Sequence, residues 1–141
     1  MLYNNVKNIL IENGWFQEEN EDLIWFNANG QSYAVVKRDQ EKNIPSLCII
    51  STHIEDFPDG AIPSIFFVAA NVNNRHFCAR VAMHSSIYEE GLDHHFLGFE
   101  FHAPKSCLGD VSIVIDTAVK ELSAIMDDFY AELDRVFPSQ E

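Results

Sequence analysis

Hydrophobic residues change their spacing along the chain, and each spacing predicts a different element. Near the N-terminus they are three or four positions apart, at Leu2, Val6, Ile9 and Leu10. This spacing is typical of a short amphipathic helix, and Gly14 stands where such a helix would end in a left-handed residue. We therefore expect the chain to begin with a helix.

A longer stripe of the same kind occupies about 110–136 and predicts the longest helix of the protein. Asp110 at its start is suited to cap the first turn, because a side-chain oxygen there can accept from a free backbone N–H. The stripe consists of Val111, Ile115, Ala118, Leu122, Ile125, Phe129, Leu133 and Val136.

Residues 23–36 have apolar positions on both sides of Asn29-Gly30, which is the strongest short signal for a hairpin with a two-residue type I′ turn. Such a turn sets the register of the two strands. The predicted pairs are Ala28 with Gln31, Phe26 with Tyr33, Ile24 with Val35, Trp25 with Ala34 and Leu23 with Val36.

Both faces of this hairpin are apolar. An antiparallel sheet with one face on its helices and the other in water should alternate apolar and polar residues instead. We therefore expect Leu23, Trp25, Ala34 and Val36 to form a partner-binding surface that a second subunit or a client protein covers.

The middle of the chain supplies the remaining elements. Residues 46–51, SLCIIS, predict a third and buried strand. Residues 63–72 are apolar nearly all round and favour a buried helix that begins at Pro63, with a strand as the competing interpretation. Residues 76–84 and 94–102 each alternate and predict a second hairpin.

The expected order is therefore helix, three strands, helix, two strands, helix (α-β-β-β-α-β-β-α). Strands that come in hairpins and blocks predict an α+β fold, an antiparallel sheet with helices packed on it. The length of 141 residues and the absence of a linker-like segment predict one domain over residues 1–141.

Charge restricts the partners. The formal net charge is −13, and no basic stripe exists, so nucleic acid and anionic membrane surfaces are not expected to bind. No apolar run reaches the ~20 residues of a membrane span, and the N-terminus does not resemble a signal peptide. We expect a cytoplasmic protein.

Its cysteines, Cys48, Cys78 and Cys107, follow no motif and are expected to be buried free thiols.

Common catalytic and cofactor motifs are absent, so we expect no cofactor, no bound metal and no enzymatic activity. The alternative is a metal-dependent enzyme or sensor that uses the second hairpin. There, an assumed register pairs His84 with His94 and His76 with His102, and places Arg80 diagonally opposite Glu100 in a surface ion pair.

Three segments and the expected element order together resemble a known family. The segments are GWFQEENEDLIWFNANGQSYAVV, AIPSIFFVAANVNNRHFCARVAM and HHFLGFEFHAP. In this pattern the chain resembles the YbjN-like family of bacterial proteins, which are similar in fold to class I type III secretion chaperones. The resemblance implies a small α+β homodimer in the bacterial cytoplasm, either a chaperone that presents hydrophobic patches to a client or a regulatory factor. It includes no catalytic signature. The expected function is thus non-catalytic binding of a client or partner protein.

Overall fold

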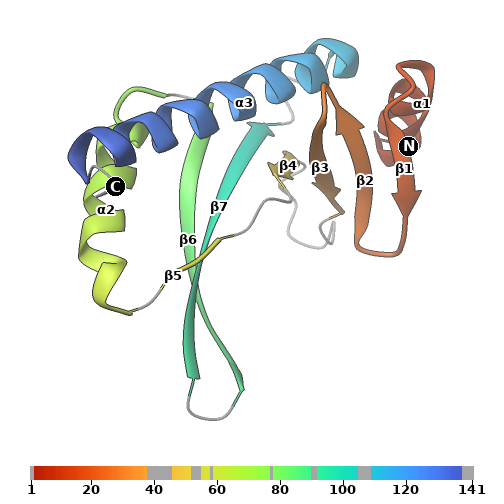
Figure 1. The fold of residues 1–141 in the computed structure, drawn as a ribbon. Helices are drawn as coiled ribbons and strands as arrows, with labels where there is room; N and C mark the ends of the chain where they lie inside the picture. The colour runs from red at the N-terminus through yellow and green to blue at the C-terminus, as the bar shows by residue number, and fades with distance from the viewer. Residues whose placement is uncertain are drawn as a thin grey trace.

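The computed structural model describes residues 2–37, 46–51, 55–57, 59–76, 78–89, 92–104 and 109–137. Three α-helices, a short 3-10 helix and seven strands follow one another along these residues (Figure 1). In chain order they are α1 (Leu2–Glu12), β1 (Phe16–Glu19), β2 (Leu23–Ala28), β3 (Gln31–Val36), β4 (Ser46–Ser51), β5 (Glu55–Phe57), η2 (Asp59–Ala61), α2 (Ile62–Asn73), β6 (Ala79–Glu89), β7 (Leu92–Pro104) and α3 (Val111–Val136).

This order confirms the predicted α+β fold. Two short strands, β1 and β5, were not predicted from the sequence. Their length of four and three residues explains the difference, because so few residues cannot show an alternating pattern. The segment after Pro63 forms helix α2 and not a strand, with proline in its first turn as expected.

All strands belong to one antiparallel sheet, in the order β1-β2-β3-β4-β7-β5, and β6 pairs with β7. Strand β7 has 13 residues and pairs with three other described strands, β4, β5 and β6. One of its edges pairs with β5 and then β4, and the other pairs with β6 along most of its length. In Figure 1 the β6–β7 hairpin projects well beyond the other strands.

The β2–β3 hairpin has the predicted turn and register. Asn29 and Gly30 both have positive φ values, 55° and 80°, which a type I′ turn requires. All five predicted cross-strand pairs are present, from Ala28 opposite Gln31 to Leu23 opposite Val36. This register assigns alternate side chains to opposite faces of the sheet.

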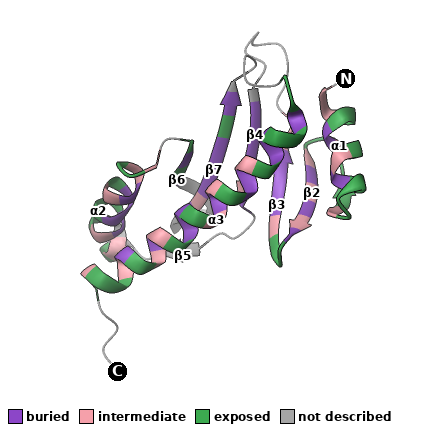
Figure 2. Ribbon diagram, turned by 90° about the horizontal axis from the view of Figure 1, so that it is seen from above, coloured by how far each residue is buried: buried purple, intermediate pink, exposed green. Residues whose placement is uncertain are grey.

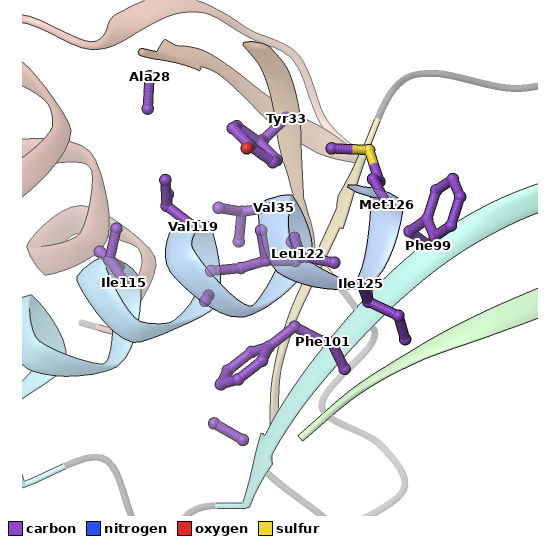
Figure 3. Packing of buried hydrophobic residues seen from close by; sticks show 14 of the residues in the cluster. Ala28, Tyr33, Val35, Phe99, Phe101, Ile115, Val119, Leu122, Ile125 and Met126 are labelled. Carbon is purple, nitrogen blue, oxygen red and sulfur yellow. The ribbon is translucent and has the colours of Figure 1, made fainter. Parts of the chain in front are cut away.

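The three helices share one face of the sheet, and the main core lies between them and the strands. In Figure 2 the buried positions of α3 alternate with exposed ones along its length, as expected for a helix that lies on the sheet. Figure 3 shows α3 residues packed against side chains from β2, β3 and β7. The largest fully buried side chains include Phe26, Tyr33, Ile49, Phe99, Leu122, Ile125 and Phe129.

The start of α3 confirms the predicted cap. The backbone N–H of Ile113 donates to Oδ1 of Asp110 at 3.3 Å, and the Asp110 backbone is extended, as a capping residue requires. Phe99 and Phe129 meet edge to face, with ring centroids 5.7 Å apart. These contacts hold α3 against the strands. No described helix packs on the opposite face of the sheet.

Candidate protein-binding face of the sheet

Backbone pairing aligns residues of successive strands in rows across the face that lies opposite the helices. One row runs from β1 to β6 through the opposed residues Glu18, Trp25, Ala34, Ile50, Glu100 and Arg80. The next row contains Leu23, Val36, Cys48 and His102. Opposed residues point to the same side of a sheet, so these two rows define what we name the open face.

The four residues predicted to bind a partner lie together in the half of the open face that is built from β2 and β3. Leu23, Trp25 and Val36 are partly exposed, whereas Ala34 is fully buried among its neighbours. Ala34 therefore presents no exposed side chain on this face. None of these four side chains belongs to the main core cluster.

Ile50 extends this apolar surface onto β4 and was not among the predicted residues. It lies opposite Ala34 and is partly exposed. The alternation in SLCIIS was the available signal, since it gives Leu47 and Ile49 to the core and Cys48 and Ile50 to the other face. The sequence did not reveal that β4 would pair with β3, which requires the tertiary fold.

The other half of the open face is polar. Glu100 is 9% exposed and forms an ion pair with Arg80, whose Nε lies 3.6 Å from Oε2. Arg80 lies directly opposite Glu100, so the predicted ion pair is present but the predicted diagonal placement is wrong. Nε2 of His102 lies 3.1 Å from the same carboxylate oxygen and 3.8 Å from Sγ of Cys48.

This Cys48, His102 and Glu100 cluster does not form a nucleophile, base and acid relay. In such a relay one imidazole nitrogen faces the nucleophile and the other faces the carboxylate. Here both neighbours meet the same nitrogen, Nε2, and Cys48 is only 1% exposed. The geometry is that of a packed polar contact at the centre of the sheet.

The predicted histidine pairs are wrong. In the β6–β7 hairpin His84 lies opposite Phe96, and His94 lies opposite Ser86. The register differs by two residues from the assumed one, so neither of these histidines faces another histidine across the hairpin. His102 is paired with Cys48 of β4, and among the described residues no group of three or more His, Cys, Asp or Glu side chains is placed so that it could hold a metal ion.

His76 has a different role, which the sequence did not suggest. It precedes β6, and its Nε2 lies 2.8 Å from Oδ2 of Asp128 in α3. Arg75 also binds Asp128 through Nε and Nη2 at 3.1 and 2.8 Å. These contacts attach the end of α2 to α3, and the hydrogen bond from Arg75 holds the pKa of Asp128 below its usual value, with a smaller effect from His76.

A second charged group fixes the edge strand β1. Glu19 lies between two lysines, with Lys7 of α1 at 3.1 Å and Lys37 after β3 at 2.7 Å. Hydrogen bonds from Lys37 and then Lys7 lower the pKa of Glu19. A short, charged edge strand of this kind disfavours uncontrolled pairing with other strands.

The cysteines differ from one another. Cys48 is buried, as predicted, but Cys78 is exposed in the turn before β6. The prediction that Cys78 is buried is therefore wrong. Cys107 lies outside the described residues.

The described residues thus define a small α+β domain with helices on one face of an antiparallel sheet and a half-apolar, half-polar open face on the other. No helix within this part of the chain is both long and apolar enough to cross a membrane.

Comparison with known proteins supports this class at the level of fold. The chain is similar in structure to YbjN of E. coli, described as a proposed transcription regulator, with a TM-score of 0.59 and 7% identity. The similarity covers 94% of this chain and 93% of the other. No protein-family model and no curated protein sequence matches the chain. At 7% identity the likeness concerns the fold alone.

Proposed function

We propose that this protein is a non-catalytic, cofactor-free protein-binding module that works as a homodimer in the bacterial cytoplasm. Its partner-binding surface is the apolar half of the open face, made of Leu23, Trp25, Ala34 and Val36. One observation carries the proposal: partly exposed apolar side chains lie side by side on a sheet face that no described helix covers.

The chemistry of the open face fits a protein partner. A partly exposed tryptophan beside aliphatic side chains is typical of the centre of a protein interface. Glu100, His102 and Arg80 provide a polar border on one side. The formal net charge of −13 favours a partner whose rim is basic.

Whether the module acts as a chaperone or a regulator depends on which partner binds. The structural neighbour YbjN is described as a proposed transcription regulator, but a shared fold favours neither role over the other. In both cases the same face would be covered when the partner is bound. The proposal therefore concerns the surface first and the biological output second.

A second exposed apolar pair provides an internal comparison. Phe66 and Phe67 of α2 are 56% and 55% exposed. If the homodimer forms through α2, the open face is left for a client. If the homodimer forms through the open face, substitutions at Trp25 will dissociate it.

Sedimentation equilibrium of three variants tests the proposal against the monomer mass of 16.1 kDa. Trp25→Ser changes the open face, Phe67→Ser changes α2, and Ile113→Ser is the matched control, since Ile113 is 63% exposed on α3. We expect wild type to sediment as a dimer. We also expect Trp25→Ser to raise the Kd of either the dimer or a purified partner by at least about tenfold. A loss of that size is typical when a residue at the centre of an interface is truncated.

Two results would refute the proposal. One is a wild-type protein that stays monomeric up to concentrations of about 100 μM, well above the Kd expected of a stable dimer. The other is a partner that binds wild type, Trp25→Ser and Ile113→Ser with the same affinity. Circular dichroism of each variant separates loss of binding from loss of folding.

A further inference from the structure

A cleft of about 540 Å³ lies on the helix side of the molecule, between the turn of the β2–β3 hairpin and the middle of α3. It is remote from the open face, because its β3 residues Gln31 and Tyr33 belong to the opposite side of the sheet. Its lining combines the hairpin residues Asn29, Gln31 and Tyr33 with Val119, Lys120, Ser123, Ala124 and Asp127 of α3.

Tyr33 is the buried member of this lining. It is 1% exposed, and its ring stacks on Phe26 with centroids 5.3 Å apart. Figure 3 shows the Tyr33 side chain between the strands and α3. Within the described part of the chain nothing is hydrogen-bonded to its hydroxyl. A buried hydroxyl without a partner is unfavourable, so this group is available to a ligand that enters the cleft.

Asp127 adds a carboxylate that is also free among the described residues. Asp127 is exposed, and no described group forms an ion pair or hydrogen bond with its carboxylate. Burial and then the charge of Asp127 raise the pKa of Tyr33, so the phenol keeps its proton at neutral pH. A neutral phenol and a carboxylate at one cleft accept hydrogen bonds from the same donor-rich group.

The remaining polar groups favour a cation over an anion. Lys120 is the cation in the lining, and its Nζ is engaged by Asp116 at 3.1 Å on the preceding turn. Ser123, Asn29 and Gln31 offer hydroxyl and amide oxygens as further acceptors. The overall charge of −13 also attracts cations to this surface.

We propose that this cleft binds a guanidinium or ammonium group, held between the Tyr33 hydroxyl and the Asp127 carboxylate. Where that group is an Arg or Lys side chain of a partner protein, the inference rests on the proposed function and adds a second, charge-specific contact to it. The same chemistry in a free amine would make the cleft a small-molecule site.

Three probes separate these sources: the blocked tripeptide acetyl-Gly-Arg-Gly-amide, its neutral citrulline counterpart, and free agmatine. Binding is followed by NMR shifts of the tyrosine rings and of the backbone amides of α3. We expect saturable shifts at Tyr33 and Ser123 with the arginine peptide and none with the citrulline peptide, because only a charged guanidinium pairs with Asp127. Agmatine that binds at least tenfold more tightly than the peptide would identify a small-molecule site.

Variants locate the contact. Asp127→Asn and Tyr33→Phe should each weaken binding by at least tenfold. Asp134→Asn, which removes an equal charge from an exposed position of α3, should leave it unchanged. Tyr33→Phe should keep the thermal midpoint of the wild type, because the hydroxyl has no described partner to lose.

The proposal is overturned if the arginine and citrulline peptides bind equally, or if neither gives a saturable shift at Tyr33. A lower midpoint for Tyr33→Phe would also count against it, since the hydroxyl would then have a structural partner. The peptide titrations, the variant titrations and the thermal midpoint all use the isolated chain. They are therefore independent of the dimer and partner assays, and either proposal can fail while the other holds.

Discussion

The side-chain amide of Asn73 forms hydrogen bonds with both backbone groups of Val81. Nδ2 donates to the Val81 carbonyl at 3.1 Å, and Oδ1 accepts from the Val81 N–H at 2.7 Å. Among the described strands β6 pairs only with β7, so the other edge of β6 has no strand beside it. The last residue of α2 therefore takes the place of a neighbouring strand at this position and ties α2 to the sheet.

Replacing Asn73 by alanine should lower the free energy of unfolding by about 1–3 kcal/mol, because it removes both bonds and leaves partly buried backbone groups unpaired. Urea unfolding measures the change. Asn8→Ala is the control, since Asn8 is exposed on α1, and this substitution should be neutral or slightly stabilising. Equal effects of the two substitutions would contradict the structural role of Asn73.

The ion pairs of α3 predict how stability depends on pH. Arg75 lowers the pKa of Asp128 below its ordinary value of 3.8, and Arg135 lowers the pKa of Glu132 below 4.5. A carboxyl with a lower pKa in the folded state stabilises the fold above its unfolded pKa. That contribution is lost as the pH falls through the folded pKa.

We therefore expect Asp128→Asn to be less stable than wild type at pH 7, and the difference to shrink as the pH falls below about 4. Urea unfolding at pH 7, 5, 4 and 3 tests this. Asp134→Asn serves as the control, because it removes the same charge from an exposed position of α3. A difference that stays constant or grows towards acid would show that Asp128 acts in another way.

The hairpin turn makes a prediction about backbone conformation. Gly30 has a φ of 80°, and a Cβ there would meet no atom within 4 Å, so any loss in Gly30→Ala comes from the backbone alone. We expect a loss of about 1–2 kcal/mol, the typical strain of a left-handed alanine. Gly60→Ala has equal space without a positive φ and should change stability by less than about 0.5 kcal/mol. Thermal or urea unfolding compares the two variants.

The two described cysteines should react at very different rates. In a Cys107→Ser background, the exposed thiol of Cys78 should react promptly with a thiol reagent. Cys48, at 1% exposure, should react only when the sheet opens locally or the protein unfolds. Mass spectrometry of the labelled peptides over time distinguishes them. Prompt labelling of Cys48 would mean that the open face near His102 opens far more readily than its packing indicates.

The sequence by itself determined the features that depend on neighbours in the chain. The Asn29-Gly30 turn fixed the register of β2 and β3, and the stripe after Asp110 fixed α3 and its cap. Turn geometry and helical periodicity are short-range properties, so a few consecutive residues contain them. The two apolar faces of the hairpin followed from the same register.

Only the tertiary structure decided what lies across the sheet. It placed β4 beside β3, which brought Ile50 to the open face, and it shifted the β6–β7 register by two residues, which separated the predicted histidine pairs. It also brought Asn73 to Val81, His76 to Asp128, and Asp127 to the cleft beside Tyr33. Contacts between residues tens of positions apart arise when helices and strands pack as whole units, and no local pattern encodes that packing.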